Sequence, residues 1–267
     1  MIRVICYIVL LLLVGCKKNE INSYLQQNEV QLVKPRILAS NKIIDSTVTL
    51  SAEIMMDKAQ IFFTDDGMEP TEESLSYREP ILVSEPATFK FKAFHPEWKP
   101  SEIAEINFVN KGHDVDSIVW LDSLNEKYKG QGSRTLINHT KASNNYTDKE
   151  WMGFDSLVSM ICIFNETTSI SSIDIGYLNH PGSWIFPPFK ITIYISYNGL
   201  DFIEKSSNEL PFPLPVPDAV VETFSIPFNK SVKGIKLKFE NVSQIPDWHE
   251  GAGNKAWLFM DEIMFNK

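Results

Sequence analysis

Two loops in the C-terminal half of the chain carry aromatic side chains that no turn or strand requires. Residues 180–188 read His-Pro-Gly-Ser-Trp-Ile-Phe-Pro-Pro, and residues 245–263 contain the run Asp-Trp-His. An indole ring presents a flat apolar face, and imidazole and carboxylate groups supply hydrogen-bond partners at its edge. A pyranose ring needs both, because its C–H face is apolar and its hydroxyls are polar. The candidate sugar-contacting residues are His180, Trp184, Asp247, Trp248 and His249.

The same aromatic rings could instead fill the end of a β-sandwich. Trp151 and Trp257 favour that interpretation, since each stands at the entry to a strand and has apolar neighbours. Trp184 and Trp248 are flanked by Pro, Gly, Ser, Asp and His. For these two, surface recognition and filling of the sandwich both stay open.

The neighbouring carboxylates Asp261 and Glu262 raise the question of glycoside hydrolysis, which uses a pair of acidic residues. Neighbouring residues on a strand point to opposite faces, so these two side chains could not easily flank one bond. A catalytic β/α barrel also needs roughly 250 residues of alternating strands and helices, and this chain shows no such alternation. The five histidines lack metal-ligand spacing, and the sequence has no Gly-x-Ser-x-Gly or phosphate-loop motif. We therefore expect no enzymatic activity.

The elements that must position these side chains are β-strands. Alternating apolar and polar residues recur in short runs bounded by Pro, Gly and Asn, whereas helical periodicity is hard to find. In residues 189–197 three isoleucines face one way, and the Asn198-Gly199 pair that follows predicts a hairpin. The fold class is therefore all-β. Further strands are expected at residues 48–50, 59–63, 88–93, 170–177 and 234–239.

The N-terminus has a short basic start, an apolar run from Val4 to Val14 and then Gly15-Cys16. Residues 1–15 are expected to be a signal peptide, because the apolar run is too short to span a bilayer as a helix. Leu13-Val14-Gly15-Cys16 resembles the lipobox of bacterial lipoproteins, which implies lipidation of Cys16. An ordinary secretory signal and an uncleaved anchor are the alternatives. Lipidation would hold the protein in the cell envelope, at the outer membrane or cell surface, with residues 16–34 as a flexible tether.

Charge and cysteine content exclude two further classes. The formal net charge is −9, whereas nucleic-acid binding needs a concentrated basic face. Cys6 leaves with the signal peptide and Cys16 is consumed by lipid, so Cys162 remains alone and no disulfide framework is expected. Because Cys162 lies in an apolar run, we expect it to be a small buried hydrophobe.

A polar break at residues 110–114 separates two modules, which we place at residues 35–110 and 112–267. In the first, residues 63–101 contain Thr-Asp-Asp-Gly, Glu-Pro-Thr, Ser-x-x-Tyr and Trp-Lys-Pro-Ser in that order. This run resembles the small immunoglobulin-like module at the C-terminal side of chitobiases and β-hexosaminidases. The resemblance implies a β-sandwich that serves as a structural spacer.

The second module has three informative runs. They are Arg-Thr-Leu-Ile-Asn at residues 134–138, Glu-Trp-Met-Gly-Phe at 150–154 and, most specific, Asp-Trp-His…Gly-Ala-Gly…Lys-Ala-Trp at 247–257. They resemble the coagulation factor 5/8 C-type (discoidin) domain, in the form that follows bacterial β-N-acetylhexosaminidases and in related carbohydrate-binding modules. The resemblance implies a jelly-roll sandwich whose loops bind terminal sugars of glycans, of N-acetylhexosamine or galactose type.

Discoidin-type sugar modules often hold a structural Ca²⁺ near the loop that corresponds to residues 134–145. The Leu-x-Asp-Gly form of that loop is Leu-Ile-Asn-His here, which loses a carboxylate and a glycine. The ligands that the resemblance implies are Asn138, Ser143, Asn144 and Glu262, a poorer set than Ca²⁺ prefers. Lys141 or water could take the place of the ion instead.

Together these features predict a lipid-anchored, non-enzymatic surface protein that binds terminal sugars of glycans through the loops of its second module. Two alternatives stay open. One is a structural adaptor that docks another surface protein, and the other, more remote, is a glycosidase of unknown type or an accessory to one.

Overall fold

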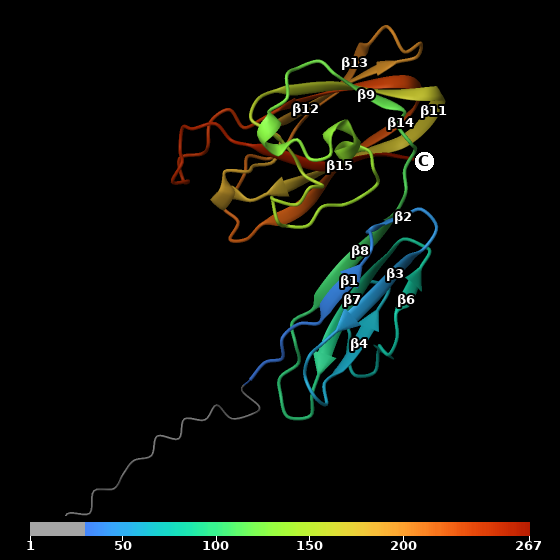
Figure 1. The fold of residues 1–267 in the computed structure, drawn as a ribbon, viewed down its shortest axis with the longest axis vertical. Helices are drawn as coiled ribbons and strands as arrows, with labels where there is room; N and C mark the ends of the chain where they lie inside the picture. Colours follow the sequence, from blue (N-terminus) through green and yellow to red (C-terminus); the bar gives the residue numbers. More distant parts are fainter. Residues whose placement is uncertain (1–29) are drawn as a thin grey trace, which may run out of the picture.

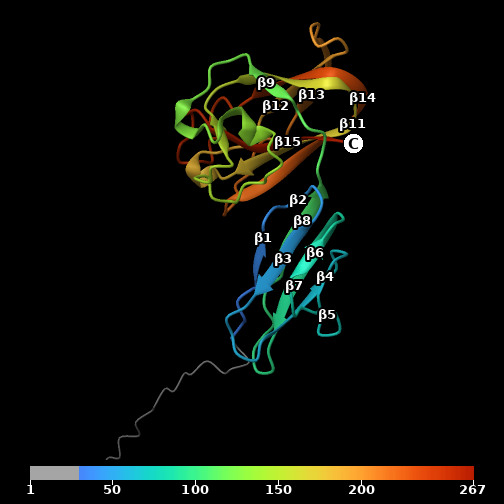
Figure 2. The same ribbon diagram turned by 45° about the vertical axis from the view of Figure 1, so that its right-hand side comes forward.

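Strands make up most of the regular structure in the computed structural model, which describes residues 30–267 (Figures 1 and 2). Three short 3₁₀ turns lie between the strands, and no α-helix occurs in residues 30–267. The all-β prediction is therefore confirmed. In the same range, no helix has the length and apolar character needed to cross a bilayer. The signal peptide and the lipidation site at Cys16 lie outside the described residues.

The N-terminal module is a sandwich of two sheets. Its strands are β1 (Arg36–Ala39), β2 (Ile43–Ile44), β3 (Val48–Glu53), β4 (Gln60–Thr64), β5 (Leu75–Ser76), β6 (Ile81–Val83), β7 (Ala87–Phe94) and β8 (Ala104–Asn110). The strand orders are β1-β3-β6 and β2-β8-β7-β4-β5. Side chains alternate along β7, which contains the strand expected at residues 88–93, so Phe89, Phe91 and Ala93 are buried on one face. All three belong to the apolar cluster of this module.

The C-terminal module contains one continuous, bent sheet. Its strands are β9 (Ser117–Trp120), β10 (Met152–Phe154), β11 (Val158–Asn179), β12 (Lys190–Ser196), β13 (Ile203–Glu209), β14 (Val220–Glu240) and β15 (Leu258–Asn266). The order is β10-β15-β11-β14-β12-β13, with β9 paired to β11. The long ladder of β11 and β14 shifts register between Ile163 and Thr168 and again near Ile170. Such bulges bend strands, which lets these two wrap around a single core.

Two local predictions within this module are confirmed. β12 and β13 form the hairpin predicted from Asn198-Gly199, with Gly199 at a φ of +81° and the Asn198 side chain accepting from the backbone of Leu200 (2.9 Å). Cys162 is completely buried, and burial raises the pKa of its thiol to about 12. It therefore packs as a small hydrophobe.

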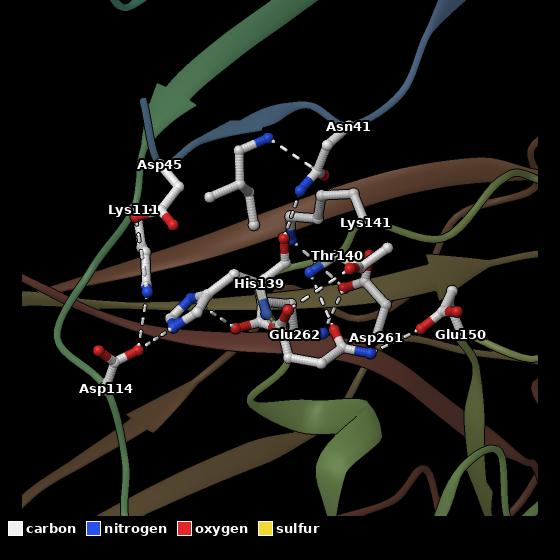
Figure 3. A network of polar contacts seen from close by, with 12 residues as sticks. Asn41, Asp45, Lys111, Asp114, His139, Thr140, Lys141, Glu150, Asp261 and Glu262 are labelled. Carbon is white, nitrogen blue, oxygen red and sulfur yellow. Dashed lines mark hydrogen bonds and ion pairs between the residues drawn. The ribbon is translucent and has the colours of Figure 1, made fainter. Parts of the chain in front are cut away.

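A polar network joins the two modules, which lie end to end (Figures 1 and 3). Asp114, in the connecting segment, pairs with Lys111 (Nζ to Oδ1, 3.0 Å) and with His139 (Nε2 to Oδ1, 3.0 Å). Asn41 of the N-terminal module donates from Nδ2 to the carbonyl oxygen of His139 (2.6 Å). The backbone amide of His113 donates to the carbonyl oxygen of Phe265 in β15 (2.7 Å). The junction thus lies at the C-terminal end of β15.

The aromatic loops lie at the other end of β15. The strand starts at Leu258, directly after the loop of residues 245–257, and its nine residues span about 30 Å. In Figure 1 this loop, in red, extends away from the C-terminus. The fold therefore separates the loops from the junction by the length of one strand.

Candidate functional site

Trp184 follows the 3₁₀ turn η4 (Pro181–Ser183) and adopts a left-handed backbone conformation, with a φ of +63°. Bulky residues rarely adopt this conformation unless their surroundings enforce it. Here the Trp184 amide donates to the carbonyl oxygen of Pro181 (2.6 Å), and its carbonyl accepts from the amide of Trp257 (2.8 Å). The indole remains 37% exposed. The backbone thus holds a partly exposed aromatic ring in a costly conformation, which is typical of a functional position.

The Trp184 ring packs directly against the backbone of Gly251. A Cβ at Gly251 would lie 2.9 Å from both Cε2 and Cζ2 of the indole, so no side chain fits there. The amide of Gly251 donates to Nδ1 of His249 (2.9 Å), and Nε2 of His249 lies 2.9 Å from the carbonyl oxygen of Pro181. Glycine 251 and His249 therefore brace the loop that carries Trp184.

A hollow of about 230 Å³ opens beside Trp184. Tyr128 contacts two other rings of its lining, with ring-centroid distances of 5.1 Å to Trp257 and 6.5 Å to Tyr146, both edge to face. The rings come from four separate segments of the chain, all at the loop end of the sandwich. The lining residues are Lys127, Tyr128, Tyr146, Ser183, Trp184, Ile185, Trp257 and Phe259. We call this site the aromatic hollow.

The aromatic hollow also offers unengaged hydrogen-bonding groups. Two indoles outside the hollow do have partners: Nε1 of the buried Trp151 donates to the carbonyl oxygen of Ser143 (2.9 Å), and Nε1 of the half-buried Trp120 donates to Oγ of Ser133 (2.6 Å). In contrast, five polar groups of the hollow form no hydrogen bond with another residue of the described range 30–267. These are the hydroxyls of Tyr128, Tyr146 and Ser183 and the indole nitrogens of Trp184 and Trp257. Flat apolar faces and open donors therefore occur side by side.

The residues predicted to contact sugar are only partly brought together. Trp184, His249 and Trp248 form a series of touching rings, with centroid distances of 6.4 Å and 5.5 Å. Of these three, only Trp184 lines the hollow, and both ring nitrogens of His249 bond to the backbone instead. Trp248 is 41% exposed but packs on the far side, against Phe186 at 6.1 Å.

The remaining two candidates do not line the hollow, although His180 contacts Tyr146. His180 is half-buried beside Tyr146, at a centroid distance of 6.2 Å, and its Nδ1 is buried without a hydrogen-bond partner in the described residues. Asp247 is exposed in the loop that leads to Trp248. Both lie outside the lining of the hollow.

The sequence interpretation missed Lys127, Tyr128 and Tyr146 and assigned Trp257 to the filling of the sandwich. Trp151 does fill it, at 1% exposure, whereas Trp257 is half-buried and lines the hollow. The sequence did contain a signal. Tyr128 stands between two lysines and near Gly130, and Tyr146 stands between Asn145 and Thr147-Asp148, which are loop compositions with no apolar neighbours for a ring.

The residues proposed for calcium do not fit the ion as they lie. Asn138 donates from Nδ2 to Glu150 (2.7 Å), and its Oδ1 accepts from the amide of Thr140 (2.9 Å). The carbonyl of Ser143 accepts from an indole, and Asn144 is exposed. Glu262 is buried, and its Oε2 accepts from the amide of His139 (3.0 Å). Within residues 30–267 no three His, Cys, Asp or Glu side chains gather as a metal site.

The ammonium group of Lys141 lies beside the buried carboxylate of Asp261, in the place that a bound metal cation would take. Nζ of Lys141 lies 3.3 Å from Oδ1 of Asp261, and both side chains are nearly or fully buried. Burial raises the pKa values of Asp261 and of Glu262, the latter to about 8, and the charge of Lys141 opposes both shifts. A Cβ at Gly176 would collide with both partners of the pair, so the glycine leaves room for it. Figure 3 shows how this group adjoins the module junction.

The acidic pair is also closed to substrates. Asp261 accepts from the amides of Ala142 (3.0 Å) and Glu262 (2.7 Å), and both acidic side chains are fully buried. These carboxylates organise the loop of residues 138–142 against β15.

Residues 39–105 match the family model of the chitobiase/beta-hexosaminidase C-terminal domain. The resemblance found in the sequence of the first module is therefore confirmed. No curated protein matches the chain.

Several solved structures are similar to the chain. CpGH89CBM32-5 from Clostridium perfringens, in complex with GalNAc-beta-1,3-galactose, has 13% identity and a TM-score of 0.36, covering 55% of this chain and 91% of that one. A SusE-like protein has 13% identity and a TM-score of 0.37, covering 85% and 94%. The C-terminal domain of a chitobiase from Bacteroides fragilis has 13% identity and a TM-score of 0.35, covering 57% and 95%. By its sequence, the segment of residues 39–105 is similar to the chitobiase/beta-hexosaminidase C-terminal domain.

Proposed function

We propose that this protein is a lipid-anchored, non-enzymatic glycan-binding protein whose aromatic hollow takes terminal sugars of N-acetylhexosamine or galactose type. The observation that carries the proposal is the combination of partly exposed rings and unengaged donors in the hollow. The family matched by the N-terminal module takes its name from sugar-cleaving enzymes, which is in keeping with a glycan as the ligand.

The chemistry of the hollow suits one sugar ring. The apolar C–H face of a pyranose would stack on an indole of Trp184 or Trp257, while the phenol and indole donors would meet its hydroxyls. The hollow is small and open to solvent, so much of a ligand would stay hydrated. We expect a dissociation constant in the range of about 1 μM to 1 mM.

The anchor and the N-terminal module would present the hollow outward from a membrane. Lipidation at Cys16 would hold the chain in the cell envelope, at the outer membrane or the cell surface. The spacer module and the length of β15, about 30 Å, then lie between the tether and the loops.

Calorimetry on the full chain carrying Cys16→Ser tests this function. Concentrated N-acetylgalactosamine, N-acetylglucosamine and galactose are titrated into the wild-type background, Trp184→Ala and Trp248→Ala. The two tryptophans are similarly exposed, at 37% and 41%, but only Trp184 lines the hollow. We expect binding that Trp184→Ala abolishes and Trp248→Ala largely retains. Absence of binding to all three sugars would refute the function, and equal losses in both variants would refute the site.

An adaptor function is the second candidate, because the tip of the β12–β13 hairpin exposes three large apolar side chains. Tyr197, Leu200 and Ile203 are 60%, 82% and 58% exposed. Clustered exposed apolar groups commonly mark protein-binding surfaces. In an adaptor, Leu200→Ser with Ile203→Ser would abolish capture of a surface partner and leave sugar binding intact. A glycan-binding protein without such a partner would show no capture before or after the change.

A further inference from the structure

We propose that the sugar bound in the aromatic hollow carries an anionic group, a carboxylate or a sulfate ester, and that Lys127 recognises it. This inference rests on the proposed function and names its ligand class more closely.

Lys127 is the one charged side chain among the eight residues that line the hollow. Its Nζ lies 4.9 Å from the ring centroid of Tyr128 and 5.8 Å from that of Trp257. An ammonium group at these distances is attracted by the faces of the rings. The charge is therefore held at the place where a sugar would stack.

The charge of Lys127 has no carboxylate partner within the described part of the chain. The neighbouring acid, Glu126, pairs with Lys129 instead (Oε2 to Nζ, 3.1 Å), and Lys127 forms no ion pair with any carboxylate of residues 30–267. The lining contains no acidic residue that would repel an anion. In a chain of net charge −9 such a site is an exception.

The backbone that carries Lys127 is fixed before any ligand arrives. In the 3₁₀ turn η2 (Glu126–Tyr128), the side chain of Asn125 accepts from the amide of Lys127 (2.9 Å). Nδ2 of Asn125 donates to Asp155 (2.7 Å), which ties the turn to the segment after β10. A charge-assisted hydrogen bond to Lys127 would thus require little reordering of the backbone.

The test compares neutral and anionic sugars of the same skeleton. Calorimetry on the Cys16→Ser full chain uses galactose against galacturonate, and N-acetylglucosamine against its 6-sulfate. We expect an anionic sugar to bind about tenfold more tightly than its neutral counterpart, as for one hydrogen bond to a charged group. Raising the salt concentration should weaken only that preference.

Two lysine variants provide the matched comparison. Lys127→Met should remove the preference for the anionic sugar over its neutral counterpart, whereas Lys129→Met, which removes the lysine paired with Glu126, should keep that preference. A preference for galacturonate alone assigns the carboxylate, and one for the 6-sulfate alone assigns the sulfate ester. Equal binding of neutral and anionic sugars, or a preference that survives Lys127→Met, overturns this inference and leaves the proposed function standing. Absence of binding to all four sugars overturns both.

Discussion

Trp184 occupies a backbone conformation that costs roughly 1–3 kcal/mol for a residue with a side chain, and its neighbours keep it there. The backbone of Pro181 and Trp257 holds its amide and carbonyl, and Gly251 leaves room for its ring. A loop without this strained conformation would fix the position of the Trp184 ring less tightly. We therefore expect that the strained backbone holds the Trp184 ring where it can contact a ligand.

Gly251→Ala tests this view of the ring. The new Cβ would lie 2.9 Å from the indole and push it out of place. We expect sugar affinity to fall at least threefold by calorimetry, with a small change in melting temperature. Gly182→Ala is the control, because its nearest neighbour would lie 3.7 Å away. Equal affinities of the two variants would show that the ring position does not matter.

Part of the site could be predicted from the sequence, and part could not. Trp184 stood out because Pro, Gly and Ser surround it, which signals a loop. His249 was noticed for the same reason, but its role in bracing depends on Pro181 and Gly251 lying beside it. Tyr128 and Tyr146 join the hollow because four segments converge at one end of the sandwich, and such convergence leaves no local pattern.

β15 is the element that organises both the loops and the junction. Its two adjacent acidic residues are buried and receive backbone amides and the ammonium group of Lys141. A buried carboxylate that loses its counter-charge is strongly destabilising. The loop of residues 138–142 therefore depends on an internal cation from the chain itself.

Lys141→Met is expected to lower the free energy of unfolding by about 3–5 kcal/mol, because it removes the ion pair of the buried Asp261. Urea denaturation measures the change. Lys149→Met, at an exposed position in a neighbouring loop, is the control and should be within about 0.5 kcal/mol of wild type. Equal stabilities of the two variants would mean that the pair does not support the fold.

Removing divalent cations tests whether Lys141 or a bound metal ion supplies the positive charge beside Asp261. With Lys141 in place, EDTA and excess CaCl₂ should leave the melting temperature unchanged within about 1 °C, since we expect no calcium ion to bind the native state beside Asp261. A drop with EDTA that calcium alone restores would show that the Ca²⁺ site implied by the resemblance is present after all.

Strand positions were well predicted, but strand lengths were not. Residues 170–177, 189–197 and 234–239 were expected as separate short strands, and they fall largely within β11, β12 and β14. β11 and β14 run for 22 and 21 residues because bulges near Ile163 and Ile170 let each continue around the core. A bulge breaks the period of two, so alternation alone ends the strand early.

The described residues form two modules joined by a short polar network, and the loops lie at the end of β15 that is far from this junction (Figure 1). The two cores could be predicted from alternation and from the polar break between them. The network could not, because Asn41 and His139 are 98 positions apart and neither has a distinctive setting.

Asn41→Ala should loosen the junction. The change removes the 2.6 Å hydrogen bond to His139 and leaves both apolar cores intact. We expect a larger radius of gyration by X-ray scattering and faster proteolysis near residues 110–114. Asn165→Ala, at an exposed position, is the control. Identical scattering curves for both variants would show that other contacts set the geometry.

The anchor is tested on whole cells of an expressing bacterium. Labelled palmitate should be incorporated into the wild-type chain, and Cys16→Ser should lose the label and leave the membrane fraction. A Cys16→Ser protein that stays membrane-bound would point to an uncleaved apolar anchor instead.

The most direct test of glycan binding at the aromatic hollow is a crystal structure of the protein soaked in concentrated N-acetylgalactosamine. A pyranose should appear in the hollow, with its C–H face on Trp184 or Trp257 and its hydroxyls within hydrogen-bond distance of Tyr128, Tyr146 or Ser183. Clear density for the hollow without a sugar, or a sugar bound only at Trp248, would contradict the site assigned to it.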